Sequence, residues 1–451
     1  MIRIRISALI VALVATLGVT APSFAETAVF VNVNVVPMTD EFVIGDQTVV
    51  VTNGKIVAIG GVDTVPVPEG AVVIDGTDRF LMPGLAEMHA HVTSDDGFDR
   101  LATLFVANGV TTIRGMLGRA SHLELRDQLA AGKRFGPRLV TSGPSLNGRS
   151  VSGAREAARM VREQHAAGYD FIKVHPGLDS AEFEALAAAA NELGMPYAGH
   201  VPVAAGVRRT LALGMATIDH LDGYFASLLP ADSGSSGGYG GFFDVMLADE
   251  ISETSIRRIA KTTARSGTWN VPTEILVEQV INDTPVAELK SRPEMRYVSA
   301  ENLRRWGEAK QAGRAEPGFN ARTAARAIEL RRLLILELHK AGAGLLLGSD
   351  APQVFNVPGF SLHRELGVLV AAGLTPYEAL RTGTVNVAEF LGTNTGRIEL
   401  GRDADLVLLD ANPLTDIANS RRVHGVMVRG DWFSRRDLDA RLEQFVVQQG
   451  K

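Results

Sequence analysis

Apolar and polar residues alternate along short stretches at both ends of the chain. The N-terminal stretches are separated by turn residues such as Asn53 and Gly54. Alternation with a period of two, bounded by turns, predicts β-strands with one buried face. These stretches cover residues 29–35, 49–52, 55–59, 405–410 and 423–433. Because both ends carry the same pattern, we expect them to form one small composite β-sandwich domain.

The long middle of the chain has a different rhythm, in which short apolar runs alternate with helical patterns such as 181–193 and 376–391. This alternation is typical of βαβ units with a parallel sheet. The expected strands are 85–91, 110–114, 138–143, 171–175, 197–201, 217–221, 269–273 and 345–350. Eight such strands most simply close into a barrel, so the sequence predicts an α/β fold built around a (β/α)8 TIM barrel.

Two segments interrupt the rhythm of the middle region. Residues 233–241 are rich in glycine and serine and follow the sixth strand, and residues 284–319 form a charged insertion after the seventh. Both lie on the side where the strands end, which carries the active site in barrels. They are candidates for lids or substrate walls, and for the second segment a plain surface excursion fits equally well.

The first residues have the pattern of an export signal. Arg3 and Arg5 give a basic start, residues 6–20 are apolar, and residues 23–25 form a small-x-small cleavage motif. The alternative is a membrane anchor, but a span needs about 20 apolar residues. We therefore expect cleavage after Ala25 and an exported protein, either periplasmic or secreted.

These patterns divide the chain into four segments. They are the signal peptide at 1–25, the first part of the β-sandwich at 26–80, the barrel at 81–394 and the second part of the β-sandwich at 395–451. Hydrophobic residues make up 46% of the chain, which is enough for a large core. We expect no membrane association once the signal has been removed.

Composition excludes several classes of protein. The chain contains no cysteine, so it has neither a disulfide framework nor a lipid-modified cysteine near the cleavage site. The formal net charge is -6, and no basic stripe of the kind that binds nucleic acid is present. Nucleic acid is therefore set aside as a partner. A homo-oligomer is compatible with the sequence.

The chemistry-bearing residues fall at the ends of expected strands. His89 and His91 end the first strand, and residues two apart project from the same face of a strand. His200 ends the fifth strand, His220 the sixth, and Asp350 the eighth. Taken alone, each histidine is also explained as a hydrogen-bonded core residue, and Asp350 as the N-cap of the next helix.

Lys173 lies inside the otherwise apolar fourth strand. Burying an ammonium group is costly unless it is neutralised or partnered. A neutral lysine can add carbon dioxide to form a carbamate, whose two oxygens are able to bridge two metals. The alternative is a lysine whose side chain reaches the rim of the barrel, with its charge in water.

All strand ends of a barrel meet at one rim, so one metal site explains these residues more economically than separate roles. The candidate ligands are His89, His91, Lys173, His200, His220 and Asp350. Nitrogen and oxygen ligands without thiolate suit Zn²⁺, although Mn²⁺, Co²⁺ and Fe²⁺ are compatible with the same set.

The order of these motifs resembles the metal-binding signature of the amidohydrolase superfamily. The likeness covers nearly all of the chain after the signal and is closest to the branch of imidazolonepropionase-like and Xaa-Pro dipeptidase-like proteins. It is carried by residues 81–91, 172–174, 199–200, 219–220, 348–350, 362–366, 374–381, 386–388 and 401–409. One departure is the sequence after Lys173, where His175 and Pro176 replace the Gly-rich turn, beginning with methionine, of many dipeptidase-like members.

The resemblance implies a binuclear site. His89, His91 and Asp350 would hold one metal, His200 and His220 the other, and Lys173, as its carbamate, would bridge them. The implied reaction is cleavage of a carbon–nitrogen bond in a small amide or dipeptide by a metal-bridging hydroxide. In that reaction Asp350 handles the proton.

Other functions remain open on the sequence. Esters and lactones are accessible to the same hydroxide. A mononuclear deaminase would want a glutamate three residues after His200, where the chain has Val203. A metal-free binding protein would use the barrel mouth as a receptor.

Three further residues are candidate substrate contacts. His175 lies two residues after Lys173 on the same face, Tyr224 follows His220 by four residues, and Arg114 ends the second strand, where it could meet a substrate carboxylate. Packing or support of the metal ligands is an equally good explanation for His175 and Tyr224. For Arg114 the alternative is an ion pair at the rim.

Overall fold

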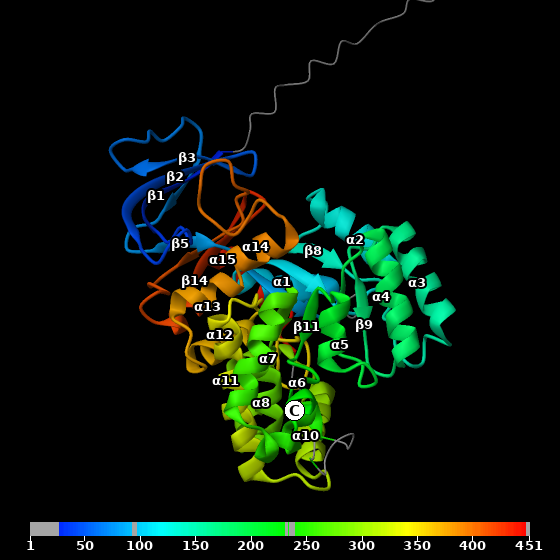
Figure 1. Cartoon of the computed structure of the whole chain (residues 1–451). Coiled ribbons are helices and arrows are strands. Elements are labelled where there is room, and N and C mark those ends of the chain that lie inside the picture. The colour runs from blue at the N-terminus through cyan, green and yellow to red at the C-terminus, as the bar shows by residue number, and fades with distance from the viewer. Residues whose placement is uncertain (1–26, 93–96, 231–232, 234–239, 448–451) are drawn as a thin grey trace, which may run out of the picture.

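The fold is described from a computed structural model, which describes residues 27–92, 97–230, 233 and 240–447 (Figure 1). The expected signal peptide at 1–25 therefore lies outside the described residues. None of the helices in the described part of the chain combines the length and the apolar character that crossing a bilayer requires.

Strands occur in three groups along the chain. The strands are β1 Thr27–Val35, β2 Ile44–Thr52, β3 Lys55–Gly61, β4 Val72–Asp75, β5 Phe80–Pro83, β6 Leu85–Ala90, β7 Val110–Gly115, β8 Arg138–Thr141, β9 Ile172–Val174, β10 Tyr197–Gly199, β11 Thr217–Asp219, β12 Trp269–Val271, β13 Leu406–Leu409, β14 Val423–Val428 and β15 Asp431–Ser434.

Helices fill the spaces between the middle strands. The helices are α1 Phe98–Ala107, α2 Ser121–Ala130, α3 Ala154–Ala167, α4 Ser180–Leu193, α5 Gly206–Leu213, α6 Tyr224–Leu228, α7 Glu253–Ser266, α8 Glu274–Ile281, α9 Val286–Lys290, α10 Ala300–Arg314, α11 Ala321–Lys340, α12 Phe360–Ala371, α13 Pro376–Thr382, α14 Val385–Leu391 and α15 Arg435–Glu443. The 3₁₀ segments are η1 Phe242–Glu250, η2 Pro293–Tyr297 and η3 Ile417–Arg421.

One eight-stranded sheet is built from both ends of the chain, in the order β15-β14-β13-β5-β1-β2-β3, with β4 also paired to β1. The junction between the two ends is the antiparallel pair of β5 and β13, in which Leu81 lies opposite Leu408. In Figure 1 the blue N-terminal strands therefore meet the orange and red C-terminal segment. The two ends share one sheet, while the description as a sandwich and the segment boundaries remain predictions.

The turn between β2 and β3 explains how the two ends fit together. Asn53 and Gly54 both have positive φ angles, of 52° and 70°, which favours asparagine and glycine. A Cβ on Gly54 would lie 2.7 Å from the carbonyl oxygen of Arg429. Glycine is therefore needed both for the turn and for the close approach of the C-terminal segment.

The middle strands form two parallel sheets, β6-β7-β8 and β9-β10-β11-β12. Parallel bridges join the sheets through Ser142 and Phe171, and join β12 to the segment after α11 through Asn270 and Leu345. That segment returns to β6 through a bridge between Ala90 and Ala351. The pairing therefore runs around a closed ring of eight parallel segments, which we call the strand ring.

Local sequence signals set the helices around the strand ring. In α4, for example, Asp179 accepts a hydrogen bond from the backbone of Glu182 while the Glu182 side chain accepts one from the backbone of Asp179. This capping box satisfies two donors at the start of the helix. Phe183 and Leu186 are buried on one face, as an amphipathic helix against a sheet requires.

The insertion at 284–319 is a folded unit, comprising α9, η2 and α10, and it packs on α8. The buried Lys310 donates to the backbone oxygen of Asn282 at 2.8 Å and to the carbonyl oxygen of Gln279. Gln279 lies in the last turn of α8 and Asn282 caps its C-terminus, where carbonyl groups have no helical donors. Lys310 thus links the insertion to the C-terminal end of α8.

Candidate active site

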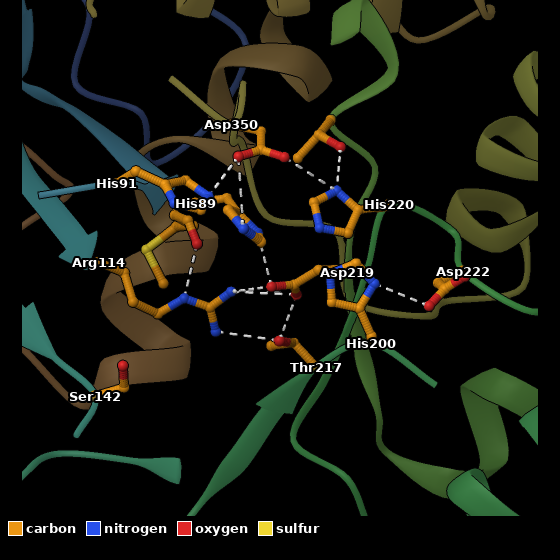
Figure 2. Close-up of polar contacts among 12 residues, drawn as sticks. His89, His91, Arg114, Ser142, His200, Thr217, Asp219, His220, Asp222 and Asp350 are labelled. Carbon is orange, nitrogen blue, oxygen red and sulfur yellow. Dashed lines mark hydrogen bonds and ion pairs between the residues drawn. The ribbon is translucent and has the colours of Figure 1, made fainter. Parts of the chain in front are cut away.

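Four histidines gather where strands of the ring end. His89 and His91 come from the end of β6, His200 follows β10, and His220 follows β11. The ring centroids of His89 and His220 are 4.4 Å apart, and those of His200 and His220 are 4.7 Å apart. Figure 2 shows all four imidazoles facing one centre.

Asp350 joins this centre from the segment that follows α11. Its carboxylate lies 2.7 Å from Nε2 of His91, 3.8 Å from Nε2 of His89 and 3.6 Å from Nδ1 of His220. Burial alone would raise the pKa of Asp350, but the neighbouring histidines outweigh it and hold the pKa well below its usual range. His89, His220 and Asp350 offer ligand atoms within 4.8 Å of one another, so they are spaced to hold one metal ion.

The carboxylate of Asp219 fixes the orientation of the His89 ring. Its Nδ1 lies 2.8 Å from a carboxylate oxygen of Asp219, and the Arg114 guanidinium donates to both oxygens of Asp219 at 3.2 Å. Burial would raise the pKa of Asp219, but Arg114 and His89 outweigh this and lower it. Since Nδ1 faces Asp219, the other nitrogen, Nε2, is left to face the centre.

Two further groups, which lie in loops, orient the rings of His200 and His220. Nδ1 of His200 is 3.0 Å from the carboxylate of Asp222, and Nδ1 of His220 is 2.8 Å from the hydroxyl of Thr273. Partners of this kind fix the orientation of metal-binding imidazoles. The strand ring therefore supplies the histidines, and the loops behind them set the direction of each ring.

Lys173 is fully buried, and its Nζ has no hydrogen-bond partner among the described residues. Burial lowers the pKa of Lys173 to about 8, which makes the neutral amine accessible. A Cβ on Gly199 would lie 3.0 Å from this Nζ. The absence of a side chain at Gly199 thus leaves room beside the amine, and an unpaired buried amine fits a group that is completed by a further ligand.

Several residues of the site have strained backbones. Asp350, His220 and Thr273 have φ angles of 61°, 64° and 46°, in the left-handed region that residues other than glycine seldom adopt. Such strain collects at functional sites, where the surrounding fold overrides it. Here it turns the side chains at the strand ends toward the centre.

A cavity of about 290 Å³ opens over this centre. His175 lines it, with its ring centroid 5.3 Å from that of His200. Its contact with substrate stays a prediction. The insertion at 284–319 contributes Ala309, Ala312 and Glu316, and the region after residue 239 contributes Phe242 and Phe243. The second interrupting segment therefore has residues in the wall of this cavity, whereas Phe242 and Phe243 lie just after the first, 233–241, which has no described residue in that wall.

Arg114 and Tyr224, expected to contact substrate, are not among the described residues that line this cavity. Arg114 is buried beneath it, where it donates to the oxygen of Met88 at 2.7 Å as well as to Asp219. The buried Tyr224 hydroxyl donates to Asn270 at 2.9 Å. Both polar groups have internal hydrogen-bond partners that suit a supporting role. Contact of either residue with substrate stays a prediction.

Sequence reasoning missed Asp219, Asp222 and Thr273 as orienting groups. For Asp219 a signal was available, since Arg114 and Asp219 are opposite charges in buried strands that need to neutralise each other. Asp222 and Thr273 lie beyond strand ends, where only the loop conformation decides which histidine they meet.

Nitrogen and oxygen ligands gathered at the ends of parallel strands define a site suited to a divalent metal. The sequence profile of the Amidohydrolase family matches residues 80–433. The chain belongs to the amidohydrolase family, and it is an enzyme, a hydrolase that acts on carbon–nitrogen bonds.

Individual relatives agree with this assignment over most of their length. The chain is 25% identical to an imidazolonepropionase of Idiomarina loihiensis over 400 residues, which cover 84% of this chain and 90% of the relative. It is 24% identical to an enamidase of Eubacterium barkeri over 394 residues, covering 85% and 86%. The solved structure of a bottromycin amidohydrolase is similar with a TM-score of 0.71 and 25% identity, covering 93% of this chain and 90% of that one.

Proposed function

We propose that the protein is a binuclear metal-dependent amidohydrolase that cleaves an amide bond of a small molecule. We propose also that the strand ring is the (β/α)8 barrel expected from the sequence, with this site at its mouth. The observation that carries the functional proposal is the buried, unpartnered amine of Lys173 beside Gly199 and the histidine cluster.

The residues of the site fit two divalent metal ions, Zn²⁺ being the best match to the ligand types. His89, His91 and Asp350 would hold one ion, and His200 and His220 the other. The carbamate of Lys173 would join them, since it forms from the neutral amine and is an anion whose charge the metal ions would neutralise.

When bound, the metal pair supplies an activated water and polarises the scissile carbonyl. The protein's own groups handle the rest. Asp350, held deprotonated by the neighbouring histidines, would take the proton from the attacking water and give it to the leaving amine. The insertion at 284–319 forms part of the cavity wall.

The test combines metal analysis with a substrate screen. Purified protein loaded with zinc should contain two ions per chain and hydrolyse amides in a panel of N-acyl amines, N-acyl amino acids, dipeptides, esters and lactones. Removal of the metal with a chelator should abolish the activity, and zinc should restore it. Activity that survives complete metal removal, or turnover of esters and lactones with no amide cleaved, would contradict the proposal.

A further inference from the structure

We propose that the substrate is an uncharged amide whose bulky apolar group lies against Phe242 and Phe243, and that the site disfavours substrates with a free carboxylate. This inference rests on the proposed amide hydrolysis and names its substrate class. It follows from the shape of a second cavity, the backbone that builds its wall, and the charges around both cavities.

The second cavity, which we call the side cavity, has a volume of about 760 Å³ and shares His200, Phe242 and Phe243 with the cavity over the histidines. Its remaining walls are largely apolar and include Val201, Val203, Ala226, Leu229 and Leu247. A volume of this size accepts a branched or aromatic group, and apolar walls favour groups that gain from leaving water. One flank of the scissile bond therefore has an apolar compartment.

Local packing and backbone conformation hold Phe243 in the wall between the two cavities. The Phe243 ring lies 5.0 Å from the ring of His220 and stacks on that of His200 with an interplanar angle of 6°. Phe243 has a φ angle of 49°, in the left-handed region. The turn before it favours glycine, because a Cβ on Gly240 would lie 2.8 Å from the backbone Cα of Asp244. A strained aromatic residue held against two candidate metal ligands is suited to contact the substrate.

Apart from the proposed metal ions, the groups around the two cavities offer no positive charge to an anionic substrate. Among the described residues that line them, there is no lysine or arginine. Apart from the histidines, the ionisable residues are the acids Asp222, Asp244, Glu316 and Asp350. A substrate carboxylate placed there would lose its water without gaining a cationic side chain as partner. A neutral amide meets no such penalty.

A nearby cationic side chain, Arg149, offers an alternative partner for a substrate carboxylate. Arg149 is exposed in a third, more open hollow, which shares His175 with the first cavity and Pro176 with the side cavity. A carboxylate that reached Arg149 would extend away from the apolar walls. This alternative predicts that removal of Arg149 weakens only acidic substrates, so a single variant separates it from our proposal.

The first experiment compares two substrates that differ only by a carboxylate. They are N-phenylacetyl-phenethylamine and N-phenylacetyl-phenylalanine, assayed with the zinc-loaded enzyme. We expect kcat/KM to be at least about tenfold higher for the neutral amide. An equal or higher value for the acid overturns the proposal. If neither these nor any other amide is cleaved by protein that holds two metals, the proposed amide hydrolysis itself is wrong.

The second experiment removes the apolar wall in one variant and adds a positive charge to the side cavity in another. Phe243→Ala should raise KM for the neutral amide about tenfold at unchanged metal content, with little effect on N-methylacetamide, which has no bulky group. Val203 is 94% exposed in the rim of the side cavity, so Val203→Arg should fold normally and improve use of the acid severalfold. Val73→Arg, on the exposed face of β4, is the matched control and should change neither substrate.

Arg149→Ala completes the set. We expect it to leave the kinetics of both substrates unchanged. A selective loss for the acid in this variant, together with no effect of Phe243→Ala on the bulky amide, would assign substrate recognition to the Arg149 hollow and overturn the proposal.

Discussion

Lys173 has surroundings that an ordinary lysine does not tolerate, since its amine is buried with no hydrogen-bond partner among the described residues. If its carbamate bridges two metals, Lys173→Ala should lower the metal content from two ions per chain toward one or none. Bicarbonate should also improve the reactivation of wild-type apoenzyme. Metal analysis and recovery of activity measure the two effects.

The matched control for this variant is Lys261→Ala, which removes an exposed lysine from α7. It should keep both metals and full activity. A Lys173→Ala variant that behaves like this control would show that the buried lysine has no part in holding metal.

Asp350 is the residue assigned to proton transfer. Asp350→Asn keeps the size of the side chain and one carbonyl oxygen but removes the basic site. General acid–base help is typically worth about 10²–10⁴-fold, so we expect kcat to fall by at least that range. The measurement is kcat with metal stoichiometry for both proteins. A variant that keeps both metals and turns over within about threefold of wild type would move the proton path to another group, with His175 tested next.

The sequence predicts the candidate metal ligands at the strand ends but does not identify the residues that orient them. Side-chain alternation places His89 and His91 on one face, and the ring geometry brings His200 and His220 to the same place. Phe243 was not foreseen, because its position depends on a left-handed turn that no local pattern announces. The structure thus gathers the expected ligands, while the identity and number of bound metals remain predictions.

Secondary-structure elements were easier to predict at their starts than at their ends. The strands expected from residues 85, 110, 197, 217 and 269 begin there. Four of these strands end one or two residues earlier than expected, whereas the strand from residue 110 ends one residue later, at Gly115. Gly199 and His220 have positive φ angles, which break the extended backbone at the ends of β10 and β11. The eighth segment carries only bridges and has no regular strand, for its last residue, Asp350, has a φ angle of 61°.

The packing of α12 gives a prediction about pH and stability. His363 on this helix is buried, with Nε2 3.0 Å from the carbonyl oxygen of Asn108 after α1 and Nδ1 2.9 Å from Ser420 in η3. Burial lowers its pKa from 6.5 to about 4. Between these values the unfolded chain binds more protons, so folding stability should be complete above pH 6.5 and decline as the pH falls toward 4, by up to about 3 kcal/mol.

The comparison that isolates this effect is His363→Gln, whose amide hydrogen-bonds but does not titrate. Urea unfolding at several pH values between the two pKa values should show a smaller loss of stability in the variant than in the wild type. Parallel pH dependences would mean that other groups, including the site histidines, account for the whole loss.

At the level of the whole molecule, the prediction concerns how the chain is processed. The basic start, the apolar run and the small residues around Ala25 predict cleavage by an export signal peptidase. N-terminal sequencing of protein recovered outside the cytoplasm should therefore begin at Glu26. Replacement of Ala25 by a bulky residue, Ala25→Phe, should slow the cleavage. Recovery of uncleaved wild-type chain in the membrane fraction would instead indicate an anchor.

The pairing of β5 with β13 sets the order in which the fold can be completed. On a ribosome, β5 emerges early and β13 near the end of synthesis, so the edge of β5 has no partner for most of that time. An unpaired edge invites wrong pairing with other chains. A chain that ends before residue 406 leaves this edge open permanently, so prematurely terminated chains should aggregate even though they carry every candidate metal ligand.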